Sequence, residues 1–159
     1  MHDYTLVLVD VQPSFHAARH RPTLKAIKRE VKMAKKRKLP VVLLELPKDV
    51  DGNPHLRTHS TITRLLERYK RHTIVKKQNS DGSHELLIEC HRLRMERPRF
   101  RICGVNTDVC VLKTALGLAQ YRPNSLIEVV QDACNSEYDA DCWDRFQGAS
   151  NIVLLPSGA

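Results

Sequence analysis

The chain has 159 residues, of which 42% are hydrophobic and 28% are charged, and its formal net charge is +8. This composition is ordinary for a globular protein, so we expect residues 1–159 to form a single domain around one core. No apolar run approaches the roughly 20 residues that a membrane-spanning helix needs, and the first apolar run, residues 4–9, has neither the basic segment nor the cleavage site typical of a signal peptide. We therefore expect a cytoplasmic protein with no membrane contact.

Much of the positive charge lies between residues 25 and 38, where Lys and Arg side chains surround Leu24, Ile27, Val31 and Ala34. This spacing is typical of a helix with one apolar face and one solvated face. Aromatic residues make up only 5% of the chain, which gives little support to base stacking. A solvated helix face is thus favoured, and a nucleic-acid partner is not expected.

Strand-like and helix-like segments alternate along the chain. The expected strands are residues 4–9, 41–46, 72–76, 100–104, 126–131 and 152–155. The expected helices are residues 23–38, 59–69, 85–95, 107–121 and 138–146. This alternation predicts an α/β protein with a three-layer α/β/α, Rossmann-like arrangement, in which a six-stranded, mainly parallel sheet carries helices on both faces. Such sheets bind ligands beyond the carboxyl ends of their strands, so the candidate site lies there.

The five cysteines are odd in number and form no CxxC pair, so we expect neither a disulfide framework nor a cysteine-rich zinc site. Most of them should be buried thiols that pack as small hydrophobic groups. Cys110 differs, because it follows the turn at Gly104 and falls in the first turn of the expected helix 107–121. The positive end of the helix dipole and its free N–H groups predict a lowered pKa, a reactive thiolate and a backbone oxyanion hole.

Two further chemical groups follow expected strands. Asp10 ends an apolar strand, where burial would raise its pKa and suit it to proton transfer, although capping of the next turn is an equal alternative. Lys76 and Lys77 end the third strand, and alternation allows at most one of them to face the site. That lysine could pair with Asp10 or stabilise a thiolate or an oxyanion, whereas a solvent-facing lysine is the favoured alternative for either residue taken alone. Together with Cys110, these residues form a plausible set of nucleophile and base.

Three segments resemble those of a known family: residues 8–15, with Leu-Val-Asp-Val-Gln and then Phe15; residues 103–111, Cys-Gly-Val-Asn-Thr-Asp-Val-Cys-Val; and residues 128–134, which end in Asp-Ala-Cys. In these segments the chain is similar to the isochorismatase-like cysteine hydrolases, which include isochorismatases, nicotinamidases and carbamoyl-amide hydrolases. The resemblance implies a three-layer α/β/α fold and an Asp-Lys-Cys catalytic triad. Cys110 would be the nucleophile, Asp10 the general base, and Lys77 the lysine, with Lys76 as its alternative.

The same resemblance implies a cis peptide bond between Val105 and Asn106, and places Phe15, Val105 and Asn106 at the substrate. It also implies cleavage of an amide or related C–N bond of a small molecule through a thioester, without a cofactor. Isochorismatase-type hydrolysis of a vinyl ether is one alternative, and a catalytically idle or nucleic-acid-associated protein of the same fold is another. We expect a homo-oligomer, because the helix expected at residues 107–121 is apolar nearly all round.

The chain departs from the family pattern at two places. The segment after the lysines has no Ser-x-Phe element, and the segment after the second strand has no Asp-x-His element of the kind that binds a metal in nicotinamidases. His55 and His59 lie further on, without acidic neighbours suited to a metal site. We therefore expect no metal ligands in this chain.

Overall fold

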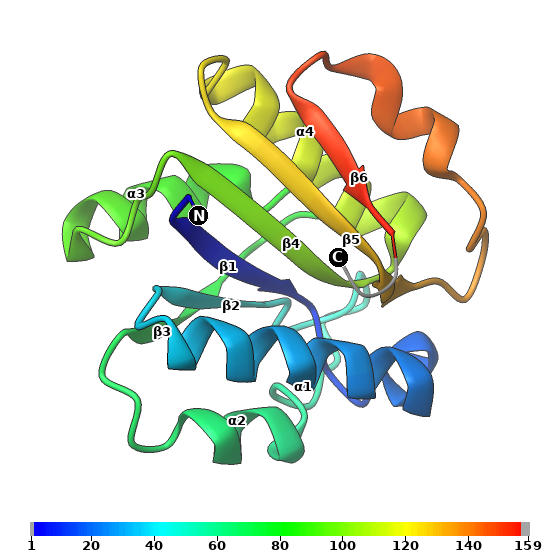
Figure 1. Cartoon of the computed structure of the whole chain (residues 1–159). Helices are drawn as coiled ribbons and strands as arrows, with labels where there is room; N and C mark the ends of the chain where they lie inside the picture. The colour runs from blue at the N-terminus through cyan, green and yellow to red at the C-terminus, as the bar shows by residue number, and fades with distance from the viewer. Residues whose placement is uncertain (1, 157–159) are drawn as a thin grey trace.

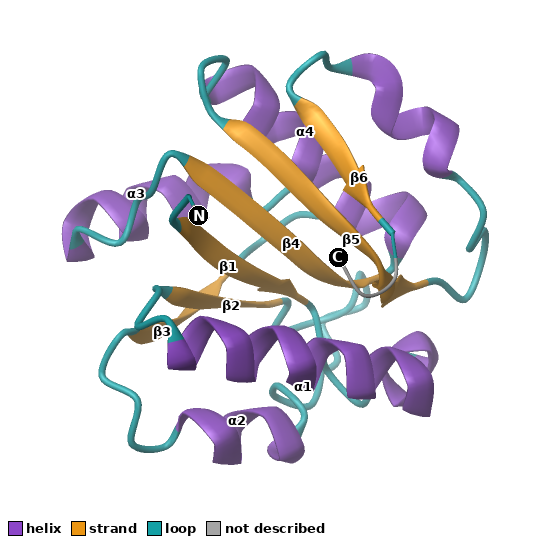
Figure 2. Ribbon diagram, viewed as in Figure 1, coloured by secondary structure: helices purple, strands orange, loops and turns teal. Residues whose placement is uncertain are grey.

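The computed structural model describes residues 2–156. Six strands form one sheet in the order β3-β2-β1-β4-β5-β6, and every neighbouring pair is parallel (Figures 1 and 2). The strands are β1 (Tyr4–Val9), β2 (Val41–Glu45), β3 (His72–Lys76), β4 (Arg99–Val105), β5 (Leu126–Asn135) and β6 (Ile152–Leu155). The helices are η1 (His16–Arg19), α1 (Arg21–Lys36), α2 (Ser60–Leu66), α3 (Ser83–Leu93), η2 (Thr107–Val111), α4 (Leu112–Tyr121) and η3 (Trp143–Gly148). The fold class expected from the sequence is confirmed.

Strand β1 lies in the middle of the sheet, and all six of its residues are buried. Successive side chains point to opposite faces. Leu6 and Leu8 pack in one core with α1 and α2, whereas Val7 and Val9 pack in another with α3 and α4. Figure 1 shows these two helix pairs on opposite faces of the sheet. Burial on both faces explains why β1 is an uninterrupted apolar run rather than an alternating one.

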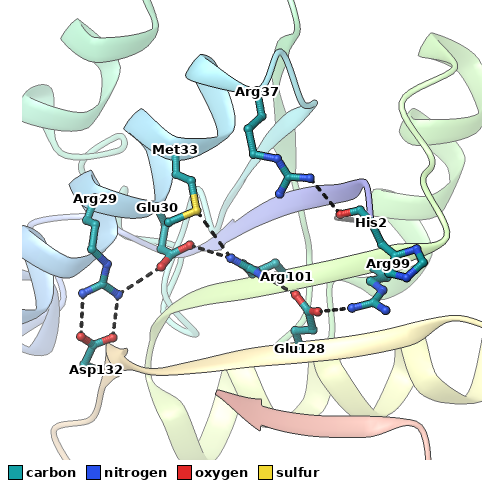
Figure 3. A network of polar contacts seen from close by, with 9 residues as sticks. All are labelled: His2, Arg29, Glu30, Met33, Arg37, Arg99, Arg101, Glu128 and Asp132. Atoms are coloured by element: carbon teal, nitrogen blue, oxygen red, sulfur yellow. Dashed lines mark hydrogen bonds and ion pairs between the residues drawn. The ribbon is translucent and has the colours of Figure 1, made fainter. Parts of the chain in front are cut away.

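Charged side chains join α1 to the sheet face beneath it (Figure 3). Arg29 of α1 holds Asp132 of β5 at 2.7 Å, and the next residue, Glu30, pairs with Arg101 of β4 at 3.3 Å. Arg101 also pairs with Glu128 at 2.8 Å. Because Glu30 and Glu128 are almost fully buried, each needs such a partner to offset its lost hydration. The basic helix is thus attached to the sheet through Arg29, while Lys25, Lys32 and Lys36 of α1 are exposed.

The order of the strands determines where a crevice can form. The chain runs outward from β1 to β2 and β3, and then returns to add β4 on the other side of β1. The connections that follow β1 and β4 therefore leave the sheet in different directions, which opens a crevice at their carboxyl ends. Asp10 follows β1 directly, and the turn that leads to Cys110 follows β4.

One expected helix, over residues 138–146, is wrong: only the short 3-10 helix η3 forms, from Trp143. Side chains explain the difference, because Ser136 Oγ accepts the N–H of Tyr138 and Asp139 Oδ1 accepts the N–H of Asp141. Such local bonds compete with helical hydrogen bonds. Strand β5 also continues four residues beyond its expected end, to Asn135, since it resumes pairing with β4 after a register shift. None of the helices within residues 2–156 is long and apolar enough to cross a membrane.

Candidate active site

Asp10 lies at the carboxyl end of β1, where the backbone adopts a left-handed conformation with φ of +49°. Its side chain is 1% exposed, and its Oδ2 lies 2.9 Å from Nζ of Lys77. Burial raises the pKa of Asp10, while the charge and hydrogen bond of Lys77 and a hydrogen bond with Cys110 act in the opposite direction. The raised pKa agrees with the sequence expectation and suits a group that exchanges protons.

Lys77 is the lysine that turns into the site. It is fully buried, and its Nζ donates to the carbonyl oxygen of Asn79 at 2.9 Å in addition to pairing with Asp10. Its backbone N–H donates to the carbonyl of Glu45, which fixes the residue beside the end of β2. Lys76 lies on the exposed side of the strand end, as alternation requires. Of the two lysines left open by the sequence, the structure brings Lys77 to Asp10.

Cys110 is held in the π-helical turn η2, where the carbonyl of Asn106 accepts the N–H groups of Val109 and Val111 on either side of it. Its thiol is 8% exposed and interacts with the side chains of both Asp10 and Lys77. The expectation of a lowered pKa is wrong: burial and the negative charge of Asp10 raise the pKa of Cys110 to about 11, although Lys77 acts in the opposite direction. The resting thiol is therefore protonated at neutral pH.

Gly104 allows the turn before Cys110 to approach β1. Its φ is +134°, and a Cβ atom there would lie 2.1 Å from the carbonyl oxygen of Val9. The peptide bond between Val105 and Asn106 is cis. The side chain of Val105 is buried in a small cluster with Ala17, which lies beneath Phe15. Asn106 Oδ1 accepts the N–H of Glu137 and so is occupied within the protein.

A cavity of about 560 Å³ adjoins the strand ends. It is lined by Phe15, Leu46, Lys48, Asp49, Val50, His55, Gln78, Asn79, Ser80 and Tyr138. Phe15 reaches this cavity, and its ring packs on that of His55 with centroids 4.7 Å apart. His55 and Tyr138 also line this cavity, and both come from loops whose path depends on tertiary packing. Another cavity, of about 650 Å³, lies along α1 and is lined by residues of that helix alone.

Gln12 is a structural residue of the site that the sequence interpretation missed. Its Nε2 donates to the carbonyl oxygens of Leu46 and Leu56, and its Oε1 accepts the N–H of Leu46. These bonds join the segment after β1 to both ends of the loop that forms one wall of the cavity. The sequence did contain a signal for this role, because a glutamine that follows a buried apolar strand needs hydrogen-bond partners.

The described side chains do not fit a metal site of the nicotinamidase kind. Asp49 is occupied in its own turn, where its carboxylate accepts hydrogen bonds from Asp51 and Asn53, and His55 packs on Phe15. Within residues 2–156, no three His, Cys, Asp or Glu side chains are grouped so that they could hold an ion.

Comparison with known proteins assigns this chain to a family. The family model described as the isochorismatase domain matches residues 4–146. The chain belongs to the isochorismatase family. This assignment confirms the resemblance carried by the three sequence motifs, and it supports a hydrolase. No curated protein matches the chain.

Solved structures share the isochorismatase fold at low sequence identity. A nicotinamidase from Staphylococcus aureus is 20% identical with a TM-score of 0.78, over 97% of this chain and 98% of that one. An N-carbamoylsarcosine amidase from Thermoplasma acidophilum is 21% identical with a TM-score of 0.77, over 99% and 98%. A ribonuclease from Caenorhabditis elegans is 19% identical with a TM-score of 0.77, over 97% and 77%. These likenesses establish the fold and leave the reaction open.

Proposed function

We propose that this isochorismatase-family chain is a cysteine hydrolase that cleaves an amide or related C–N bond of a small molecule. The observation that carries the proposal is the meeting of Asp10, Lys77 and Cys110, which come from three separate strand ends. A buried carboxylate in contact with a thiol is the pairing that nucleophilic catalysis by cysteine needs. The amidases among the solved structures of this fold support the same class of reaction.

The raised pKa of Cys110 determines the first step. Because the thiol is protonated at rest, its proton must leave as Sγ attacks the substrate carbonyl, and the Asp10 carboxylate accepts it. A tetrahedral intermediate forms with its negative charge on the former carbonyl oxygen. Backbone N–H groups around Asn106 and Cys110 and the positive charge of Lys77 stabilise that charge.

The second half of the cycle returns the enzyme to its starting state. The intermediate collapses by breaking its C–N bond, and the leaving nitrogen takes the proton from Asp10 and departs as ammonia or an amine. Water then attacks the thioester while Asp10 removes one of its protons. The acid product leaves, and Cys110 regains the proton as its thiol. The sum is amide plus water giving acid plus ammonia or amine.

The experiment is a screen for ammonia release over small amides, ureas and carbamoyl compounds, with wild type, Cys110→Ala, Lys77→Met and Lys76→Met compared. Wild type and Lys76→Met should turn over the same compound at similar rates. Cys110→Ala and Lys77→Met should lose at least about a thousandfold in kcat, the scale at which removing one member of a catalytic set acts. Turnover that survives in Cys110→Ala would refute the covalent route, and activity on a vinyl ether in that variant would favour isochorismatase chemistry.

A ribonuclease of the same fold supports a second candidate, which is RNA as substrate. The basic face of α1 supplies positive charge for a phosphate backbone, and it includes Lys25, Lys28 and Lys32 along the cavity on that helix. Such binding would weaken steeply as salt rises. Retention of RNA that is unchanged between 50 and 200 mM salt, or absent at both, would dismiss this candidate.

A further inference from the structure

Thr114 lies four residues after Cys110, in α4, which continues directly from η2, and it has no place in the proposed chemistry. It is fully buried, and its hydroxyl oxygen accepts the N–H of Gly82 at 3.1 Å. The same hydroxyl points to the carbonyl oxygen of Ser80 at 3.5 Å, at the long limit of a hydrogen bond. Thr114 therefore connects α4, which continues from the turn that holds Cys110, to the loop that follows Lys77.

Gly82, which Thr114 holds, packs against the side chain of Lys77. A Cβ atom at Gly82 would lie 2.8 Å from Cδ of Lys77 and 2.9 Å from Cδ1 of Leu44, so the glycine backbone packs directly against the lysine side chain. The same loop supplies the carbonyl oxygens of Asn79 and Ser80, to which Lys77 Nζ donates at 2.9 and 3.4 Å. Both the stem and the head of Lys77 are thus bounded by the loop that Thr114 holds.

We propose that Thr114 is a positioning residue that sets the distance between the Lys77 ammonium and Cys110. This inference rests on the proposed function, because it assigns Lys77 and Cys110 to one site. When the hydroxyl is removed, Gly82 loses its acceptor and the loop can move away from α4. The ammonium then moves with the loop, and its positive charge acts less on the Cys110 thiol. The consequence is a less acidic thiol, although no residue that touches substrate has changed.

The test measures the rate of Cys110 alkylation by iodoacetamide between pH 7 and 11, with the modified peptide identified by mass spectrometry. Thr114→Val, which keeps the shape and removes the hydroxyl, should slow alkylation at pH 8 about tenfold, which corresponds to a rise of one unit in apparent pKa. Thr114→Ser keeps the hydroxyl and should stay within twofold of wild type. Wild-type rates in Thr114→Val, or equal slowing in Thr114→Ser, would overturn the proposal.

Thr5→Val is the matched control. Thr5 is also fully buried, and its hydroxyl donates to the carbonyl of Met95 at 2.6 Å, at the opposite end of β1 from the site. It should lower the melting temperature and leave the pH profile of Cys110 unchanged. Should Thr114→Val fail to fold, Gly82→Ala tests the same path, because its Cβ presses on Lys77. A wild-type profile in folded Gly82→Ala would equally overturn the proposal.

A second readout separates failure of this inference from failure of the proposed function. The side-chain NMR resonances of Lys77 report the position of the ammonium whether or not Cys110 is reactive. They should shift in Thr114→Val and return to wild-type values in Thr114→Ser. If Cys110 reacts no faster than Cys90 while these shifts occur, the proposed nucleophile fails and the positioning by Thr114 stands. If the resonances do not move, the positioning fails whatever the reactivity of the thiol.

Discussion

The buried pair of Asp10 and Lys77 supports a quantitative prediction. Lys77→Met replaces the charged lysine by an apolar side chain of similar length and leaves the Asp10 carboxylate without its partner. Since the two side chains are 1% and 0% exposed and their charged atoms lie 2.9 Å apart, water cannot replace the lost ammonium. Removing one member of such a pair costs about 3–5 kcal/mol of unfolding free energy. Lys76→Met, next to it on the exposed side of the strand end, should cost at most about 0.5 kcal/mol.

The stability cost of Lys77→Met should depend on pH, and the raised pKa of Asp10 sets the direction of that dependence. Asp10 has a raised pKa in the folded protein, so its contribution to stability is fully present below its unfolded value near 4 and is lost as pH rises through the folded value. Lys77 opposes this shift, and Lys77→Met should raise the folded pKa further. The variant should therefore lose more stability relative to wild type at pH 8 than at pH 5, because a larger fraction of its Asp10 carboxyl group is protonated at the lower pH.

The assay is urea unfolding at pH 5 and pH 8, followed by circular dichroism and by the fluorescence of Trp143, the single tryptophan. The double variant Asp10→Asn with Lys77→Met removes both charges and should recover at least about 2 kcal/mol relative to the sum of the single variants. Three results would refute the reasoning: a cost below about 1 kcal/mol for Lys77→Met, additivity in the double variant, or equal costs at the two pH values.

Three other predictions concern the backbone, the thiols and the cavity wall. Gly104→Ala should destabilise the protein by at least about 3 kcal/mol in thermal unfolding, because its Cβ would strike the backbone of β1, whereas Gly148→Ala, whose Cβ meets nothing closer than 3.6 Å, should stay within about 1 kcal/mol. Above pH 9 the stability should fall by about 1.4 kcal/mol per pH unit for each buried thiol, since the pKa of Cys110 is raised to about 11 and that of Cys90 to about 12; Cys90→Ala should lessen the slope, and a flat profile in reducing buffer would contradict the raised values. Gln12→Leu should cost about 2–3 kcal/mol and speed proteolytic cleavage of residues 47–58, because two hydrogen bonds to Leu46, at the start of that loop, and one to Leu56, within it, are lost; cleavage at the wild-type rate would show that the loop is held by other contacts.

The strands could be predicted because each carries a local pattern. Their apolar, β-branched runs mark them, and a strand buried on both faces must be apolar throughout. The end of β5 depends on pairing with β4, a contact that no local pattern encodes. The missing helix after it has a local cause, because Ser136 and Asp139 accept backbone N–H groups two residues ahead, and the apolar periodicity used to predict the helix does not register such bonds. The limit seen at the end of β5 also applies to His55 and Tyr138, which reach the cavity through folded loops.

The sequence by itself determined the α/β architecture, the family and the residue types that follow the strands, since alternation and short motifs are properties of the chain. Only the tertiary structure decided between Lys76 and Lys77, because the choice depends on which side of the strand end faces Asp10. It also showed that the pKa of Cys110 is raised, whereas the sequence predicted a lowered pKa. A helix start favours a thiolate, but burial and a neighbouring carboxylate act at shorter range and prevail. Desolvation depends on what the fold packs around a group, and no local stretch of sequence specifies that.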